Sequence, residues 1–102
     1  WLAPVQVRIL PITERQHDYA HQIQAEMEQH NIRVEVDLRS EKIGYKIREG
    51  QLQKIPYLLI LGDKELEAQS VAVRHRKEGD LGAMPLADFV KRVKTEIEKK
   101  SL

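Results

Sequence analysis

The residues with the most suggestive spacing for chemistry are two histidines four positions apart, in the segment His17-Asp-Tyr-Ala-His21. On a helix, histidines at this spacing share a face and can bind one metal ion, as in the HExxH pattern of zinc proteases. Aspartate here replaces the glutamate that activates water in that pattern, and the sequence shows no evident third ligand. The two histidines are also in line with Gln24 and Glu28, away from the apolar positions of the helix. The sequence therefore favours a solvated helix face over a metal site.

Other patterns of catalytic residues are absent from the sequence. It contains no GxSxG elbow of a serine hydrolase, and Gly62-Asp-Lys lacks the GxxxxGK[ST] frame of a phosphate-binding loop. The chain has no cysteine, which excludes disulfides, thiolate zinc sites and thiol nucleophiles. We therefore expect no catalytic residue, no metal and no cofactor in this chain.

Two clusters of basic residues indicate a different chemistry, the binding of RNA. One cluster is Arg74-His-Arg-Lys77. The other lies in the central segment, where five basic residues outnumber Glu41 and Glu49: Arg39, Lys42, Lys46, Arg48 and Lys54. The net charge is only +1, so a preference for nucleic acid must come from such local patches. Because about a quarter of the residues in average proteins are charged, the clusters alone also fit an ordinary solvated surface.

The elements that must position these residues follow from the hydrophobic pattern. It predicts strands near residues 5–11, 33–38, 57–61, 70–76 and 81–84, and helices over 13–31, over 42–55 and from Pro85 onward. The run at 57–61 is apolar throughout, as a central parallel strand requires. The order β-α-β-α-β-β-β-α predicts an α/β fold, in which a mixed sheet carries helices on both faces. A length of 102 residues fits one domain.

Local signals refine these elements. Thr13 and Gln16 have the spacing of a capping box, Ser40 is placed to cap the second helix, and Asn31 is a plausible left-handed stop. Gly62-Asp-Lys-Glu65 is predicted to be a turn, and Gly79-Asp80 a hairpin turn. In the second helix the spacing predicts an inner face of Gly44, Ile47, Gln51 and Ile55, and a water-facing side of Lys42, Lys46, Glu49 and Gln53.

The central segment also carries a family resemblance. DLRSEKIGYKIREGQLQKIP, followed by GDKE, resembles the C-terminal anticodon-binding domain of bacterial threonyl-tRNA synthetase, a class II aminoacyl-tRNA synthetase. The flanking pieces WLAPVQV, ITERQ, VAVR and DLGxM agree with it, so the resemblance covers residues 1–102 as one domain. Prolyl, histidyl and glycyl enzymes share the fold, whereas EKIGYKIRE is specific to the threonyl group. The resemblance implies a three-layer α/β/α domain with a five-stranded mixed sheet and three helices.

The resemblance implies a function for the whole chain. It implies binding of the anticodon loop of threonine tRNA, whose middle G and third U are splayed out and read, within a cytoplasmic, ATP-dependent threonine–tRNA ligase. The class II catalytic motifs are absent here, so ATP, Mg and zinc are expected in other domains of this longer enzyme. The longer enzyme is expected to be a homodimer and the isolated domain a monomer, with no DNA and no membrane partner. The chain begins at Trp1 rather than methionine, which indicates a fragment.

Four residues match positions at which the family contacts RNA: Arg74, Glu65, Lys54 and Ser40. Arg74 matches the arginine that recognises the middle G, whose O6 and N7 an arginine fork can pair with together; a surface ion pair is the alternative. Glu65 matches a glutamate near the third base, or is an ordinary turn charge. Lys54 replaces an arginine found in some members, which keeps the charge but not the planar fork. Ser40 replaces the common asparagine, and it either contacts RNA or only caps the helix.

Two other classes of function are weighed against this one. A stand-alone relative could keep the fold and serve as a protein-interaction or regulatory module; the retained Arg74 and Glu65 argue against it, whereas Ser40 leaves it open. A small doubly wound metabolic enzyme is disfavoured because the sequence has no cofactor loop.

Overall fold

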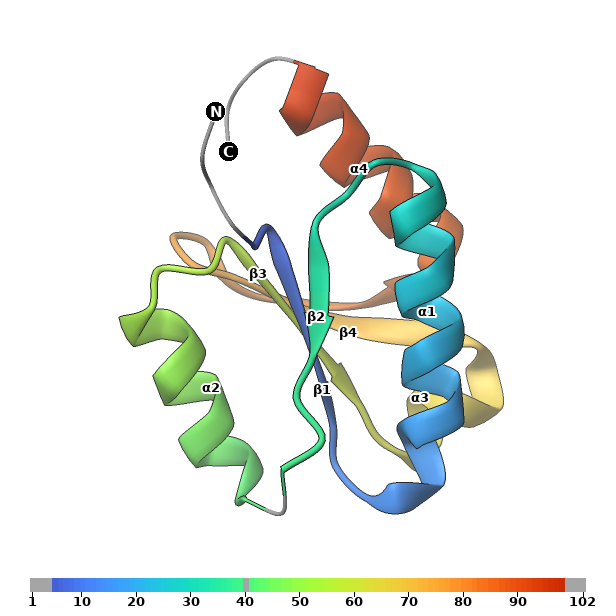
Figure 1. Cartoon of the computed structure of the whole chain (residues 1–102), viewed down its shortest axis with the longest axis vertical. Coiled ribbons are helices and arrows are strands. Elements are labelled where there is room, and N and C mark those ends of the chain that lie inside the picture. Colours follow the sequence, from blue (N-terminus) through green and yellow to red (C-terminus); the bar gives the residue numbers. More distant parts are fainter. Residues whose placement is uncertain (1–4, 40, 99–102) are drawn as a thin grey trace.

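In the computed structural model, five strands form one mixed sheet with helices on both of its faces (Figure 1). The structure describes residues 5–39 and 41–98, apart from the side chain of Ile97. In chain order the elements are β1 (Val7–Pro11), the 3₁₀ turn η1 (Glu14–Gln16), α1 (His17–Gln29), β2 (Val34–Val36), α2 (Ile43–Leu52), β3 (Tyr57–Leu61), α3 (Asp63–Ala68), β4 (Ser70–His75), β5 (Gly79–Pro85) and α4 (Leu86–Glu98).

The strand order is β2-β1-β3-β4-β5. β1 pairs in parallel with β2 and β3, and β4 pairs antiparallel with β3 and β5. β1 is buried along its whole length, and β3 nearly so, because helices cover both of their faces. The mixed sheet and the central position of residues 57–61 confirm the fold class predicted from the sequence.

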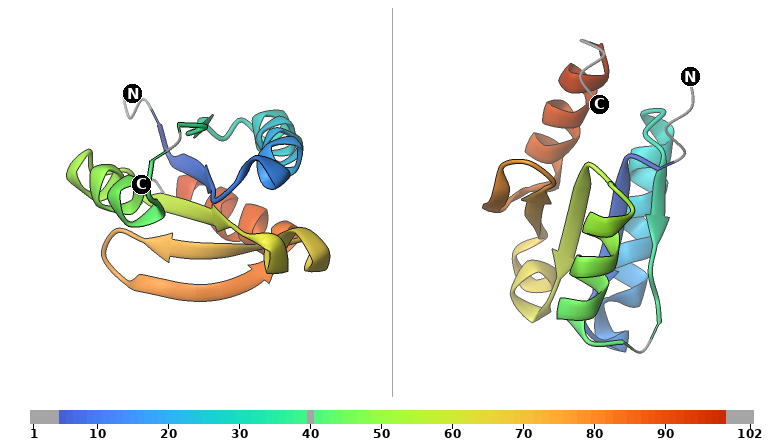
Figure 2. Two further views of the ribbon diagram at one scale, coloured as in Figure 1. Left: turned by 90° about the horizontal axis from the view of Figure 1, so that it is seen from below. Right: turned by 90° about the vertical axis from the view of Figure 1, so that its left-hand side faces the viewer.

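Each face of the sheet has its own core. The larger core lies under α1 and α4 and contains Val7, Ile9, Ala20, Ile23, Met27, Tyr57, Leu59, Val71, Val73, Phe89, Val90 and Val93. The smaller core lies under α2 and contains Leu10, Ile55 and Leu58. Figure 2 shows α2 alone in front of the sheet, with α1 and α4 behind it. We call these two sides the α2 face and the α1/α4 face. The predicted apolar stripes of the first and last helices are confirmed, while Ile97 lies outside the described side chains.

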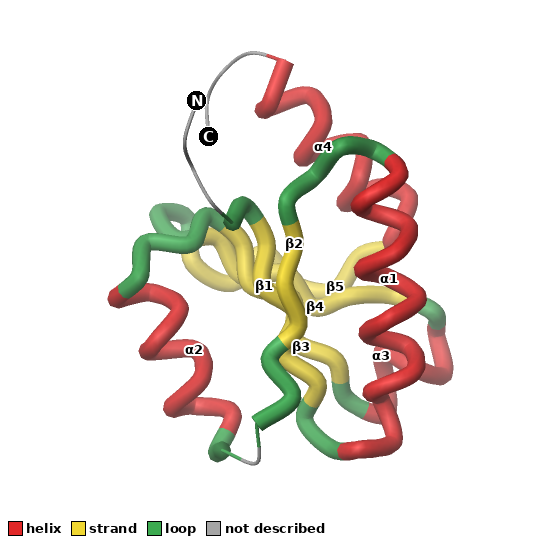
Figure 3. The backbone as a smooth tube through the Cα atoms, viewed as in Figure 1, coloured by secondary structure: helices red, strands yellow, loops and turns green. Residues whose placement is uncertain are grey.

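The segment predicted to be a turn after the third strand begins a helix instead. Gly62 is the N-cap of α3, and the Glu65 carboxylate accepts a hydrogen bond of 2.7 Å from the Gly62 N–H. Two carboxylates in the first turn suit the positive end of a helix, and Leu66 packs against the larger core. The fold therefore has four α-helices in its described part rather than three, and Figure 3 colours the short α3 as a helix.

The second helix differs from the prediction in its start and in its buried side. Lys42 is the N-cap and makes no side-chain cap bond, whereas Ser40, the predicted cap, lies outside the described residues. Lys46, predicted to face water, is 3 % exposed, and its Nζ donates to the Asp37 carbonyl at 3.2 Å. Packing sets this orientation, because Gly50 lies close enough to Leu58 that a Cβ atom would be 2.7 Å from the leucine Cδ2. Helix α2 therefore turns the side that contains Lys46 and Gly50 towards the sheet.

Turn residues account for the other local results. The capping box of Thr13 and Gln16 is present, and Asn31 has a left-handed φ of 61°, as predicted. β5 already begins at Gly79, so the hairpin turn is Arg76–Glu78 rather than Gly79-Asp80. Pro85 ends β5 instead of beginning the last helix.

Among the described residues, no helix is long and apolar enough to span a membrane.

Candidate nucleic-acid interface

One row of side chains crosses the whole sheet on its α2 face. The strand registers pair Arg8 with Glu35 on β2 and with Leu58 on β3, and Leu58 in turn with Arg74 on β4. Arg74 is paired with Asp80 on β5, next to a register shift between Val73 and Arg74. Residues directly opposite each other on neighbouring strands point to the same side of a sheet. The register therefore places two arginines in this row, on either side of Leu58.

Arg74 is a half-buried cation without a partner. Its Nε atom is buried and makes no hydrogen bond, and within the part of the chain that the structure describes no ion pair involves its guanidinium. α2 packs on β1 and β3, through residues that contact Leu10 and Leu58, so Arg74 lies beside the helix rather than under it. An unsatisfied buried N–H is unfavourable unless another molecule provides an acceptor.

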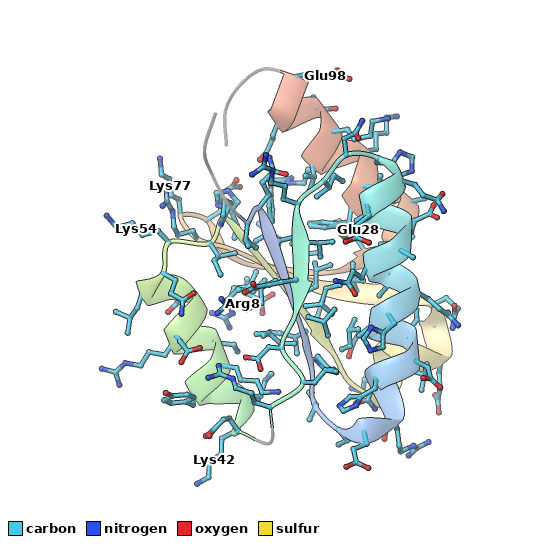
Figure 4. All side chains as sticks on the ribbon, viewed as in Figure 1. Arg8, Glu28, Lys42, Lys54, Lys77 and Glu98 are labelled. Atoms are coloured by element: carbon cyan, nitrogen blue, oxygen red, sulfur yellow. The ribbon has the colours of Figure 1, made fainter. Side chains whose placement is uncertain are left out.

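Lys54 lies in a strained turn that contacts Arg76, two residues beyond Arg74. The Ile55 and Lys54 N–H groups donate to the Gly50 and Gln51 carbonyls, the paired bonds of a Schellman motif, and Lys54 takes the left-handed position with φ of 61°. Arg76 binds this turn, because its Nη1 donates to the Lys54 carbonyl at 3.4 Å. Figure 4 shows the side chains of Lys54 and Lys77 pointing outward on the same side of the molecule. We call Lys54, Arg74, Arg76 and Lys77 the basic corner.

Not all of the cations counted in the sequence are available at the surface. The Arg39 guanidinium donates to both carboxylate oxygens of Asp37, at 2.9 and 2.8 Å, and also binds Glu49. These bonds from Arg39 hold the pKa of Asp37 and of Glu49 below their ordinary values. Arg39 is exposed but neutralised by these two carboxylates, and Lys46 is buried, so neither residue provides an unpaired surface charge.

The sequence reasoning missed Arg8, the other arginine of the row. It is 8 % exposed, forms an ion pair with Glu35 and donates to the Gln53 Oε1 at 2.7 Å. Gln53 caps the C-terminus of α2, directly before Lys54. Arg8 thus ties the end of this helix to the sheet. The signal for it was an arginine in a strand whose other residues are all apolar.

Glu65 lies away from the basic corner. It lies in the first turn of α3, beyond the carboxyl end of β3, whereas Arg74 is paired with Leu58 near the start of that strand. One of its carboxylate oxygens is bound to the Gly62 N–H, and the group is near Tyr19, whose pKa is raised by burial and by the Glu65 charge. The structure therefore links Lys54, through Arg76, to the strand that contains Arg74, and it places Glu65 beyond the other end of β3. Ser40 lies outside the described residues, and its contact with RNA stays a prediction.

The predicted solvated character of the histidine pair agrees with the structure. His21 and Asp18 are exposed on α1, and the nearest polar partner of His21 is Gln24, at 3.5 Å. Over residues 5–39 and 41–98, no group of three or more histidine, aspartate or glutamate side chains could hold a metal ion.

Comparison with known proteins gives one consistent result. Residues 6–96 match the family described as the anticodon binding domain. The chain is 69 % identical over 102 residues to a threonine–tRNA ligase of Syntrophomonas wolfei and 59 % identical over 101 residues to one of Clostridium botulinum strain Hall. The two matches include 100 % and 99 % of this chain, but the chain spans only 16 % of each relative's length.

Solved structures show the same similarity. The RNA binding domain of threonyl-tRNA synthetase from Cryptosporidium parvum Iowa II superposes with a TM-score of 0.85 at 28 % identity, over 93 % of this chain and 24 % of that one. Histidyl-tRNA synthetase from Nostoc sp. PCC 7120 also gives a TM-score of 0.85, over 93 % of this chain and 23 % of that one; at 19 % identity it shows the fold alone. With the family matched over residues 6–96, this chain belongs to the anticodon binding domain family.

Proposed function

We propose that this chain is the part of a threonine–tRNA ligase that binds the anticodon loop of threonine tRNA. The identity of 69 % to such a ligase supports the choice of enzyme, and the family match supports the choice of partner. Since the chain spans 16 % of that relative, ATP and Mg chemistry, and any zinc, are assigned to other parts of the longer enzyme. The observation that carries the proposal is Arg74, a half-buried cation whose Nε lacks an acceptor; Nη1 of Arg8, in the same row, also lacks a hydrogen bond, but Arg8 is ion-paired with Glu35.

The residues of the basic corner suit the reading of a splayed-out base. An arginine fork can bind O6 and N7 of guanine together, so Arg74 is assigned to the middle G of the anticodon. Lys54 is exposed in the turn that Arg76 contacts, and it provides a charge for a neighbouring phosphate. A wrong middle base leaves the Arg74 fork unpaired, which costs on the order of 1–3 kcal/mol of binding free energy.

Glu65 is assigned to the third base. Its carboxylate is held by the Gly62 N–H, which leaves acceptor capacity for the N3–H of uracil. Because Glu65 follows the carboxyl end of β3 and Arg74 is paired with Leu58 near its start, the two bases must lie at different ends of β3, as single-stranded loops with unstacked bases allow.

The test compares the binding of two anticodon stem–loops at one fixed salt concentration, one native and one with the middle G replaced by A. The fixed concentration matters because phosphate contacts alone give salt-dependent binding that is blind to sequence. We expect a preference of about tenfold or more for the native loop, lost in Arg74→Ala and not restored in Arg74→Lys. Equal binding of both loops would refute base reading by this chain. Binding of neither would favour the protein-interaction function.

A further inference from the structure

Asp80 is a carboxylate placed within the basic corner. It lies directly opposite Arg74 on β5, so both side chains project from the α2 face, with Cβ atoms about 5 Å apart at the usual spacing of such pairs. Asp80 is exposed, and no ion pair joins it to Arg74 in the part of the chain that the structure describes. Arg74 and Asp80 thus face each other across two strands with opposite charges that are not paired with each other.

The backbone fixes the orientation of the Asp80 carboxylate. Its Oδ1 accepts a hydrogen bond of 2.8 Å from the Gly82 N–H. Gly82 has a φ of 82°, which a glycine adopts readily, at the register shift of the hairpin. Oδ1 is therefore held against the strand, and Oδ2 together with the remaining acceptor capacity of Oδ1 is left for further donors.

A carboxylate in this position is unfavourable for simple phosphate binding. It repels the phosphates that Lys54 and Arg76 attract, so a surface that served only for electrostatic docking would bind RNA more tightly without it. A carboxylate accepts hydrogen bonds and cannot donate them, so what it can take from RNA is an N–H or O–H donor. Guanine presents two such donors side by side on its Watson–Crick edge, N1–H and the 2-amino group.

We propose that Asp80 is a specificity-determining residue that forms a guanine clamp with Arg74. Arg74 binds O6 and N7 on one edge of the base, and Asp80 accepts from N1–H and the 2-amino group on the adjacent edge. Adenine lacks the 2-amino group and has an acceptor at N1, so its Watson–Crick edge is repelled by the carboxylate. The inference rests on the proposed function, because it requires the middle G to bind beside Arg74.

The test combines base analogues with one substitution, and its readout is the dissociation constant at fixed salt. The stem–loop carries guanine, inosine, which lacks the 2-amino group, or 7-deazaguanine, which lacks the N7 acceptor, at the middle position. We expect the wild-type chain to lose about tenfold in affinity for each analogue. In Asp80→Asn, Oδ1 can still accept from Gly82 N–H, so the amide nitrogen turns towards the donors of guanine. This variant should bind the guanine loop about tenfold more weakly and lose its penalty for inosine, while it keeps the penalty for 7-deazaguanine.

Two controls separate the possible outcomes. Glu67→Gln removes an equal charge from the exposed side of α3 and should leave all analogue penalties unchanged. If Asp80→Asn binds every loop more tightly and keeps the inosine penalty, Asp80 acts only through its charge and the clamp is overturned. Thermal unfolding of Asp80→Asn verifies that the variant is folded, and the analogue series on the wild-type chain needs no substitution. If the wild-type chain shows no 7-deazaguanine penalty and Arg74→Ala changes nothing, the proposed function itself fails, which is a different result.

Discussion

The strained turn at Lys54 predicts that stability and RNA binding respond in opposite directions to one substitution. Lys54 occupies the left-handed C′ position of a Schellman motif, with φ of 61°, where glycine is the usual residue. The left-handed conformation costs a non-glycine residue roughly 1–2 kcal/mol, and the extra freedom of glycine in the unfolded chain offsets about 0.4–1 kcal/mol of the relief. Lys54→Gly should therefore raise the free energy of unfolding by about 0.5–1 kcal/mol.

The same substitution should weaken RNA binding. A stabilisation of this size raises the Tm by about 2–8 °C in a domain of this length, which calorimetry or circular dichroism detects. The anticodon stem–loop should bind Lys54→Gly more weakly at low salt, and the slope of log K against log salt should fall by about 0.7 for one lost single-strand phosphate contact. Greater stability together with weaker binding would indicate that the strain is kept because it presents a cation.

Two further substitutions separate the backbone from the charge. Lys54→Gln keeps the left-handed side chain and removes the charge, so it should lose RNA affinity without gaining stability. Gln69→Gly relieves a similar φ of 53° at the end of α3 and should leave RNA affinity unchanged. Unaltered RNA binding by both Lys54 variants would refute the role of this turn. A lower Tm for Lys54→Gly would refute the strain argument.

Four other substitutions test the elements that position the site. Gly50→Ala should lower the free energy of unfolding by about 1 kcal/mol or more, because its Cβ would lie 2.7 Å from Leu58. Gly44→Ala, whose Cβ meets nothing within 4 Å, should raise the free energy of unfolding by about 0.5–1 kcal/mol. Denaturant titration compares the two variants. The hydrogen bond from Arg39 lowers the pKa of Asp37 in the folded chain. The stability that Asp37 contributes is therefore present above the unfolded pKa of about 4 and is lost as the pH falls through the lower folded pKa. Asp37→Asn should flatten the acid limb of the curve of unfolding free energy against pH. Burial and the hydrogen bond to Glu96 raise the pKa of Tyr57 to about 12. The stability that Tyr57 contributes is therefore present below about pH 10 and is lost as the pH rises through about 12. Ultraviolet titration should show one tyrosine that ionises near pH 12, and this transition should be absent in Tyr57→Phe.

The sequence predicted the sheet well because its apolar periods are simple. The run at 57–61 and the stripes of the first and last helices depend only on residue type and spacing, and burial then follows. α2 was harder, because Lys46 and Gly50 share its buried side with Ile43 and Ile47, of which only Ile47 was predicted to face inward. The lysine stem packs while its ammonium finds the Asp37 carbonyl, a partner that local spacing does not reveal.

In the candidate site, too, local residue spacing predicted the face of a strand but not the contacts between distant segments. Alternation along β4 was enough to place Arg74 on the face opposite Val71 and Val73, and the register confirms this. The opposition of Arg74 and Asp80 depends on a register shift in the hairpin, and the burial of Arg8 depends on Glu35 and Gln53, far along the chain. Such contacts between distant segments cannot be obtained from the period of one strand.

The most direct test of the central claim is a titration of the ¹⁵N-labelled chain with the threonine anticodon stem–loop at fixed salt, followed residue by residue in NMR spectra. The account predicts that the largest shift changes fall on the amides around Lys54, Arg74 and Asp80, with smaller ones near Glu65, and that the loop with the replaced middle G abolishes those at Arg74 and Asp80. Shift changes confined to the α1/α4 face, or the same changes with both loops, would contradict it.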